Sequence, residues 1–444
     1  MIEFAVIHNG GTDVPLRELP DGMTVPVGDL AEMHRSAQRI ALQQADQAVL
    51  AEQLGFHYFF MTEHHFQTEG TEYNPNPLMV EAYIAAQTER IRLGQMANIL
   101  AWHHPIRLAE QGALLDILSG GRLEFGVGRG AQPRETEVFG QVYGSTNQDQ
   151  ARNRAYFEEA YALILKAWTE TSFAFRGQFF TIPPTWTYWG NKMTAEYFSQ
   201  PGVGRTREDI LEVLDEGAAP HLRELSVFPQ PLQKPYPQVW EPTTSPRSNK
   251  WAARQGINVF CPGLGRDAVK AYVSSYYEEA ERTGYPDRLG RGRFKYGWDC
   301  ERKRGCGFIR FIHIADKGIS HERYLSLKHF IPNYAMGIHG SGDLSTVVGS
   351  GDGGRATYDR ALESGMFLHG SKQQVIDGLL SDREVGEYED FIVLASLEFP
   401  GMSAELEEEQ LRAFAEEVAP VLRRECVGSP DLPVATPREK IGAM

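Results

Sequence analysis

Cysteine and positive charge are both scarce in this sequence, and each scarcity argues against a class of protein. The 444 residues include four cysteines, and no two of them form a CxxC pair. We therefore expect neither a disulfide framework nor a structural zinc site, and we expect the protein in a reducing cytoplasm. The formal net charge of −15 argues against nucleic acid and anionic lipid as partners, because both attract a basic surface.

Long apolar runs are also lacking, and no signal peptide is expected. No apolar run approaches the length of a membrane span, and the chain opens on a strand pattern instead of the basic and apolar parts of a signal peptide. The apolar fraction of 42% and the charged fraction of 23% are typical of a globular protein with a full-size core.

Short apolar segments alternate with helical patterns along most of the chain, which is typical of βαβ units and a parallel sheet. Eight strands are predicted, at 2–8, 56–61, 91–100, 122–128, 237–241, 257–260, 307–315 and 391–399. Helices are predicted at 37–55, 78–90, 105–118, 245–255, 266–283, 319–330 and 403–423. Eight parallel strands close a TIM barrel, a (β/α)8 fold with the helices outside. A doubly wound open sheet is the alternative, but the first strand-to-helix connection is long and lacks a GxGxxG loop.

Three segments interrupt this alternation. Residues 183–236 are rich in Pro, Gly, Trp and Tyr, with one predicted helix at 206–216. Residues 335–360 are rich in Gly and Ser, which is typical of a mobile loop, and the polar tail at 427–444 is predicted to be disordered. We expect a single barrel domain over residues 1–426, in which the insertion forms either a lid or substrate wall or a peripheral contact segment.

Polar and ionisable residues follow the predicted strands at the ends where barrel enzymes bind their ligands. We call this edge of the predicted barrel the rim. Five strands contribute to it, with Glu63, His64 and His65 in MTEHHF, then Asn98, Arg129, Ser245 with Ser248, and Glu398. Because the carboxyl ends of parallel strands meet at one edge, these residues are candidates for a common site.

Each candidate also has a structural interpretation. Adjacent side chains on an extended chain point in opposite directions, so either His64 or His65 is expected to face away from the site. Arg129 lies between glycines in GVGRG, which allow an anion to approach the backbone, although a surface ion pair is the alternative. Ser245 and Ser248 suit the N-terminus of any helix, and hydroxyls at a helix N-terminus also suit a phosphate.

A metal site is a weaker interpretation of the histidines. His57, His64, His65, His103 and His104 lie in one stretch of the sequence, but they form neither HExxH nor an HxH pair at the first strand. Glu63 directly precedes His64, which is poor spacing for two ligands of one ion. We therefore expect no metal ion at this site.

Several motifs resemble those of the bacterial luciferase-like flavin-dependent monooxygenase family. They are MTEHHF, ERIRLGQMANIL, HHPIRLAEQGALLDILSGGRLEFGVGRG with the later EVFG, and KWAARQG. The resemblance covers about residues 1–170 and 237–260, and residues 365–425 more loosely. It implies an eight-stranded α/β barrel that uses reduced FMN or, in some branches, a reduced deazaflavin.

The resemblance also implies roles for single residues. His64 matches the catalytic histidine of the family motif, Arg129 matches the arginine that binds the flavin phosphate, and Ser245 and Ser248 match hydroxyls of the same phosphate site. Ala97–Asn98 falls where the family has a non-prolyl cis peptide under the flavin ring, so both residues are expected to bind the cofactor.

The resemblance also concerns two acids, and the sequence differs from luciferase at two positions of the site. Glu398 matches a rim acid, and Glu63 or Glu398 is expected to orient or assist His64, whose pKa is expected near neutrality. Gly128 stands where luciferase has its reactive cysteine, and Thr244 stands where luciferase has an acid beside the phosphate. Light emission is therefore not expected.

The function implied by the resemblance is that of a two-component monooxygenase. Reduced FMN from a separate NAD(P)H-dependent flavin reductase would react with O2 to give a flavin hydroperoxide, which oxygenates a small organic substrate. The alternatives are a deazaflavin-dependent dehydrogenase or reductase, a non-catalytic flavin-binding protein and a metal-dependent barrel hydrolase. A homodimer formed through the barrel helices is expected.

Overall fold

A computed structural model describes most of the chain. The described residues are 1–130, 132–142, 146, 148–188, 200, 211–212, 220–335 and 358–426. The predicted tail at 427–444 and residues 336–357 of the predicted loop lie outside them.

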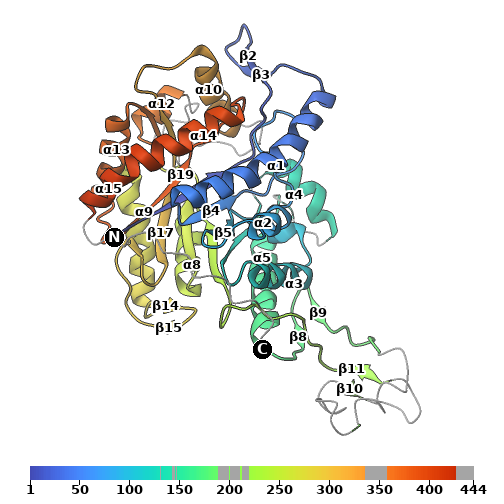
Figure 1. The fold of residues 1–444 in the computed structure, drawn as a ribbon. Coiled ribbons are helices and arrows are strands. Elements are labelled where there is room, and N and C mark those ends of the chain that lie inside the picture. The colour runs from blue at the N-terminus through green and yellow to red at the C-terminus, as the bar shows by residue number, and fades with distance from the viewer. Residues whose placement is uncertain are drawn as a thin grey trace.

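Eight parallel strands of the described residues close into a barrel (Figure 1), which confirms the predicted fold class. They are β1 (Ile2–His8), β4 (Tyr58–Met61), β5 (Arg92–Gln95), β7 (Leu123–Gly128), β12 (Gln238–Pro242), β13 (Asn258–Cys261), β17 (Arg304–Ile314) and β19 (Phe391–Ser396). Each pairs in parallel with the next, and β19 pairs with β1 to close the barrel.

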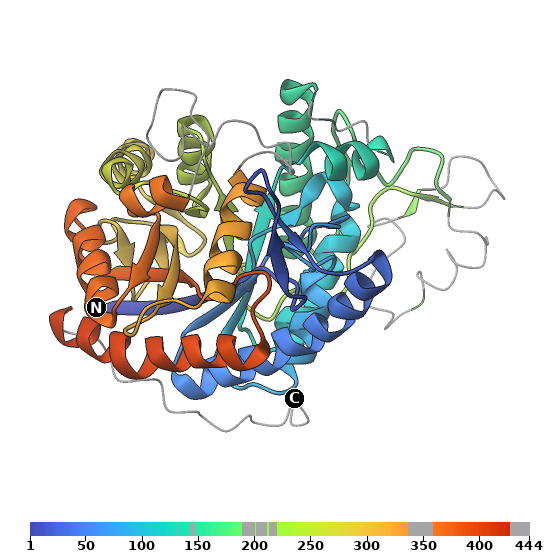
Figure 2. The ribbon, with the colours of Figure 1, turned by 90° about the horizontal axis from the view of Figure 1, so that it is seen from above.

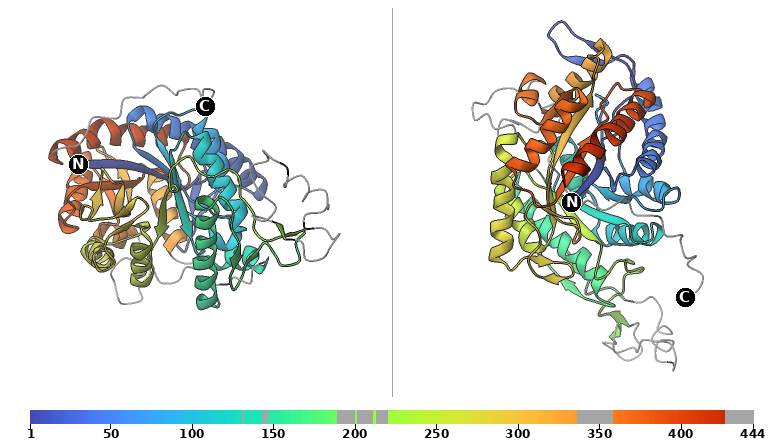
Figure 3. Two further views of the ribbon diagram at one scale, coloured as in Figure 1. Left: turned by 90° about the horizontal axis from the view of Figure 1, so that it is seen from below. Right: turned by 60° about the vertical axis from the view of Figure 1, so that its left-hand side comes forward.

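Helices surround the barrel strands (Figure 2). Those that follow a strand and cover the barrel are α1 (Leu30–Leu54), α2 (Pro77–Ala85), α3 (Pro105–Leu118), α5 (Gln150–Thr169), α8 (Pro246–Gln255), α9 (Arg266–Arg282), α10 (His321–Ala335), α13 (Lys372–Val385) and α14 (Ala404–Ala413). After α14, a π-helical turn (Phe414–Val418) leads into α15 (Ala419–Glu425), which returns to the beginning of β1 (Figure 3).

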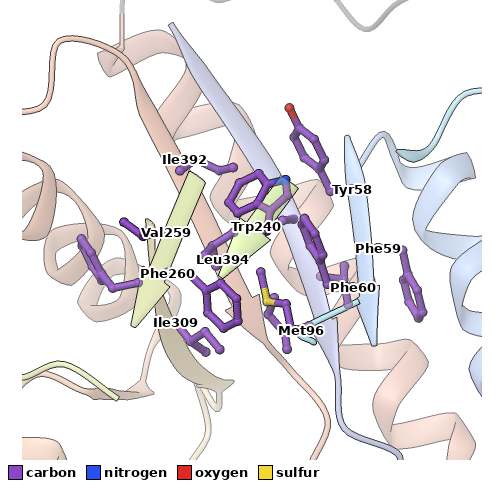
Figure 4. Close-up of a cluster of buried hydrophobic side chains, with 14 of the residues drawn as sticks. Tyr58, Phe59, Phe60, Met96, Trp240, Val259, Phe260, Ile309, Ile392 and Leu394 are labelled. Atoms are coloured by element: carbon purple, nitrogen blue, oxygen red, sulfur yellow. The ribbon is translucent and has the colours of Figure 1, made fainter. Parts of the chain in front are cut away.

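The core of the barrel is aromatic. On β4 the side chains of Tyr58 and Phe60 lie on one face and that of Phe59 on the other (Figure 4), as expected from the alternation of a strand. Phe60 packs edge to face against Trp240, with 5.2 Å between the ring centroids. All four residues are fully buried. Tyr58, Phe60 and Trp240 fill the barrel interior, which is therefore packed and does not form a pore, and Phe59 is buried on the other face of β4.

The amino-terminal end of the barrel is closed by a hairpin. It joins β16 (Trp298–Asp299) to the beginning of β17, and the Trp298 ring lies 5.4 Å from that of Trp240. The Trp298 indole N–H donates to Glu3 Oε2 at 2.8 Å, and the Tyr58 hydroxyl donates to the same oxygen at 3.1 Å. This end is therefore packed, and the candidate residues lie at the opposite end.

The structure differs from the sequence prediction in the insertion. The predicted helix at 206–216 is wrong for the two residues described there, because Leu211–Glu212 forms β10 and pairs antiparallel with β11 (His221–Leu222). Two further short strands, β8 (Phe175–Arg176) and β9 (Thr181–Ile182), form another hairpin. In Figure 1 both hairpins lie to one side of the barrel, beyond α3 and α5.

Other small elements were not predicted. A hairpin of β2 (Leu16–Glu18) and β3 (Thr24–Pro26) lies in the long connection after β1, and β18 (Phe367–Gly370) pairs with the end of β17 outside the closed barrel. All four cysteines are buried thiols. In the part of the chain that the structure describes, no helix combines the length and apolarity that crossing a bilayer requires.

Candidate active site and cofactor site

The candidate residues follow the carboxyl ends of five barrel strands. Glu63, His64 and His65 follow β4, Asn98 follows β5 in the short strand β6 (Asn98–Ile99), Arg129 follows β7, Ser245 follows β12 and Glu398 follows β19. The rim therefore carries all of them, and their contacts divide them into a histidine–carboxylate cluster and an arginine cluster.

Glu63 is a buried carboxylate that holds two segments of the rim together. Its Oε2 accepts the backbone N–H of Ile99 at 2.7 Å, and its Oε1 lies 2.7 Å from His103 Nε2. Burial alone would raise the pKa of Glu63, but the charge of His103 and the hydrogen bonds lower it to about 2. Glu63 thus pairs with His103, lies 3.7 Å from His65 Nε2 and acts on His64 through its charge. Its predicted role in assisting His64 remains a prediction.

The ion pair of Glu63 with His103 is expected to make the stability of the fold depend on pH. A carboxyl whose folded-state pKa is about 2 instead of 4.5 contributes about 3 kcal/mol above the ordinary pKa, and this is lost as the pH falls from 4.5 towards 2. Urea unfolding of wild type and Glu63→Gln should therefore differ most above pH ~5 and less in acid. A difference in unfolding free energy that stays constant from neutral to acid pH would contradict this.

His64 lies between two buried carboxyl groups. Its Nε2 is 3.2 Å from Glu72 Oε2, and its Nδ1 is 3.3 Å from Glu135 Oε1 on α4 (Pro133–Phe139). Burial alone would lower the pKa of His64, but the charges of Glu72 and Glu135 raise it to about 9. The prediction of a pKa near neutrality is therefore wrong, because the sequence did not reveal the two acids on either side of the ring.

His65 points elsewhere, as the alternation of adjacent side chains predicts. Its ring centroid lies 4.5 Å from that of Phe139 and 5.2 Å from that of Trp102. Its backbone N–H donates to Glu135 Oε1 at 2.6 Å. His65 thus packs into an aromatic cluster, while its backbone helps to fix the carboxylate that contacts His64.

Glu398 is committed to the backbone that follows β1. Its Oε1 accepts the N–H of Gly11 at 2.6 Å and its Oε2 accepts the N–H of Asn9 at 3.1 Å. The carboxyl is buried and acts on Glu72 only through its charge. These contacts give Glu398 a structural task, and its predicted catalytic role remains a prediction.

The predicted cis peptide is present one bond earlier than expected. The non-prolyl cis bond joins Met96 to Ala97, whereas the sequence analysis placed it at Ala97–Asn98. The Asn98 amide donates to Gln95 Oε1 at 2.8 Å and to the Gly126 carbonyl at 2.9 Å. Asn98 therefore ties β6 to the neighbouring chain segments, which is the structural alternative for this residue.

Arginines gather at the N-terminus of α8. Arg129 donates to Gln150 Oε1 at 3.2 Å and to Asn153 Oδ1 at 3.3 Å. Burial lowers the pKa of Arg129, and the charges of Arg154 and Arg247 lower it further. The three guanidinium groups therefore act on one another through their charges.

Two hydroxyls complete the arginine cluster. Ser245 is the N-cap of α8, and its side chain accepts the N–H of Ser248 at 3.3 Å. Arg154 Nη2 donates to Ser248 Oγ at 3.1 Å. We call Arg129, Arg154, Arg247, Ser245 and Ser248 the arginine cradle. Sequence reasoning missed two of its members, Arg154 on α5 and Arg247 in the first turn of α8.

One buried acid lies near the cradle. Glu241 on β12 is 2% exposed, and burial raises its pKa to about 8 although Arg129 and Arg154 act to lower it. Arg154 Nη1 is buried without a hydrogen-bond partner among the described residues, and its ion pair with Glu158 is long, at 3.8 Å. Guanidinium groups, hydroxyls and a helix N-terminus are the donors that suit a phosphate dianion, so the residues present fit the phosphate of FMN.

A metal centre finds no comparable support. Within the described ranges, no group of three or more His, Cys, Asp or Glu side chains is arranged to hold a metal ion. The histidines of the rim instead form ion pairs with carboxyl groups, His64 with Glu72 and Glu135, and His103 with Glu63.

Comparison with known proteins finds one family model and several curated relatives. Residues 25–193 match the family model of the luciferase-like monooxygenases. The uncharacterized protein y4wF of Sinorhizobium fredii is 29% identical over 55% of this chain and 58% of its own length. The oxygenase component of the flavin-dependent trigonelline monooxygenase of Acinetobacter baylyi is 27% identical over 52% of each chain. The alkanal monooxygenase alpha chain of Photorhabdus luminescens is 35% identical over 27% of this chain and 31% of its own.

The resemblance seen in the sequence is thereby confirmed: residues 25–193 match the luciferase-like monooxygenase family model, and relatives of this chain are named as flavin-dependent and alkanal monooxygenases. The chain spans about half the length of the first curated relatives that it matches.

Solved structures share the fold over nearly the whole chain. Monooxygenase RslO1 from Streptomyces bottropensis gives a TM-score of 0.64 at 22% identity, covering 95% of this chain and 99% of that one. The oxygenating constituent of 3,6-diketocamphane monooxygenase from Pseudomonas putida, in complex with FMN, gives 0.64 at 19% identity, covering 94% and 98%. At these identities the likeness shows the fold alone.

Proposed function

We propose that this protein is the oxygenase of a two-component flavin-dependent monooxygenase, which uses reduced FMN and O2 to oxygenate a small organic substrate. The observation that carries the proposal is the arginine cradle, which lies on the same rim as the His64 cluster. The names of the trigonelline and diketocamphane monooxygenases support it.

The residues of the cradle would hold the cofactor by its phosphate. Arg129, Arg154 and Arg247 supply positive charge, and the hydroxyls of Ser245 and Ser248 supply short hydrogen bonds. By the family resemblance, Ala97 and Asn98 would lie beside the flavin ring. When bound, reduced FMN supplies the electrons that activate O2, so that one oxygen atom enters the substrate and the other leaves as water.

The chain's own contribution to the reaction centres on His64. Because its pKa is raised to about 9, the ring is an imidazolium at neutral pH. It supplies a positive charge and a proton at the rim, where negative charge develops during oxygen transfer. Glu135 fixes the orientation of the ring, since its Oε1 lies 3.3 Å from Nδ1 and can accept a hydrogen bond from the proton there.

Two kinds of partner follow from the proposal. Reduced flavin would come from a separate NAD(P)H-dependent reductase, in line with the name "oxygenase component" of the Acinetobacter baylyi relative. A homodimer would use the apolar side chains that α2 and α3 expose, which are Met79, Tyr83, Leu114 and Leu118.

The domain organisation is also part of the proposal. We infer that residues 1–426 form one barrel domain and that the insertion at 183–236 contributes a lid or wall to the substrate site. The described part of the insertion exposes Trp186 and Tyr188, which are side chains suited to an apolar ligand.

The test is turnover with supplied reduced flavin. The purified protein, a flavin reductase, NADH and FMN are mixed with candidate substrates, and oxygen consumption is compared with the mass of the product. A product heavier by one oxygen atom, formed only with substrate, protein and reduced FMN together, is the expected result. Hydride transfer from a reduced deazaflavin without oxygen uptake would instead establish the dehydrogenase alternative, and flavin binding without any product would establish the non-catalytic one.

A further inference from the structure

Glu72 is a buried acid in the connection between β4 and α2 that the proposed function does not yet use. Its side chain is fully buried, and its Oε2 lies 3.2 Å from His64 Nε2. Neither of its carboxyl oxygens receives a well-aligned hydrogen bond from the described residues. A buried carboxylate without donors is costly, so the adjacent imidazolium is the group that compensates it.

The groups around this pair are mainly acids, which come from several elements. Those that act on Glu72 or His64 are Glu63 after β4, Glu69 in the same connection, Glu135 on α4 and Glu398 after β19. Glu69 is itself paired with Arg134, which donates to it at 3.1 Å. A positive charge on His64 is stabilised by Glu72, Glu135 and Glu63, and most directly by Glu72 and Glu135, which contact its ring.

We propose that Glu72 is a positioning residue of the reaction, which holds His64 in its charged, doubly protonated form at the rim. Glu135 fixes the Nδ1 side of the ring and Glu72 fixes the Nε2 side, so the imidazolium is held from both ends. The use of this charge in turnover rests on the proposed function, whereas the contact and its electrostatic effect do not. Burial and the neighbouring acids raise the pKa of Glu72 to about 7, although the charge of His64 acts to lower it. Because the pKa of His64 is about 9, Glu72 is ionised at the pH where His64 loses its proton.

The direct test is the titration of His64, followed by NMR on histidine-labelled protein without flavin. In Glu72→Gln the pKa of His64 should fall by roughly 1–3 from its wild-type value, because a carboxylate in contact with the ring is replaced by a neutral amide. Glu72→Asp keeps an acid at this position and should restore part of the shift, and it provides a second measurement if the amide variant does not fold. Glu69→Gln, three residues away, is the matched control and should change the His64 titration much less, because Glu69 is paired with Arg134.

Turnover gives the second measurement. If the imidazolium is the active form, the alkaline limb of the kcat pH profile should move to lower pH in Glu72→Gln by the same amount as the His64 titration. A purely structural role would lower stability without moving that limb. The inference is overturned if His64 titrates at the same pH in wild type and Glu72→Gln, or if its titration moves while the alkaline limb does not. If no substrate is turned over at all, the proposed function fails, and the NMR titration still decides the role of Glu72.

Discussion

Replacing Arg154 by alanine is expected to weaken the binding of FMN by roughly 10- to 150-fold and to leave the binding of riboflavin unchanged. The guanidinium of Arg154 is buried against Ser248 and has one nitrogen without a hydrogen-bond partner in the described part of the chain. A phosphate at the N-terminus of α8 would accept a hydrogen bond from this nitrogen. A hydrogen bond to a charged group contributes about 1.5–3 kcal/mol. Riboflavin has no phosphate, so it should not respond to this change.

The measurement is a fluorescence titration of each variant with FMN and with riboflavin. Arg107→Ala is the matched control, because Arg107 is an exposed arginine that pairs with Glu110 on α3. Both variants lose one positive charge, so a general electrostatic effect would appear in both. Unchanged preference for FMN over riboflavin in Arg154→Ala would contradict the assignment of the phosphate site, and so would an equal loss of preference in Arg107→Ala.

Replacing His64 by alanine is expected to lower kcat by about 10²- to 10⁴-fold, while the affinity for FMN changes little. The imidazolium is the positive charge that the rim places between Glu72 and Glu135, and it is not part of the arginine cradle. Loss of the imidazolium should therefore lower kcat without weakening the binding of the FMN phosphate. This outcome would separate an enzyme from a protein that only binds flavin.

The measurement is steady-state turnover with supplied reduced FMN, together with FMN titration of the same samples. Because alanine would leave two buried acids without their cation, His64→Gln is the companion variant, which keeps a hydrogen-bonding side chain without the charge. His34 on α1 is exposed, and His34→Ala is the control for histidine replacement in general. A folded His64 variant that retains wild-type kcat would remove His64 from the proposed mechanism.

The barrel strands were predictable because their sequences carry a strong signal. Strands covered on both faces are almost continuously apolar, and each such run is followed by a helical pattern that ends at a glycine or a polar cluster. The short strands β16 and β18 carry no such signal. They exist because they pair with the two ends of β17, a long-range contact that no local pattern encodes.

The site was predictable only where it lies at strand ends. Topology alone places His64, Arg129 and Ser245 on the rim once the barrel is assumed. Glu72 and Arg154 lie in a connection and on a helix, where an acid or an arginine is most often exposed. Their importance appears only when the fold buries them, and the same burial explains why the pKa of His64 could not be predicted from its own sequence motif.

The length of β17 has a consequence for how this chain can change in evolution. Residues 306–311 of β17 complete the barrel with β13 and β19, whereas residues 311–314 continue beyond it and pair with β18. β18 is therefore anchored on the part of β17 that extends beyond the barrel, and it takes no part in closing the barrel. Loss or replacement of β18 would leave the strand number and stagger of the barrel intact, so we expect related proteins to vary at this strand without rebuilding their barrel.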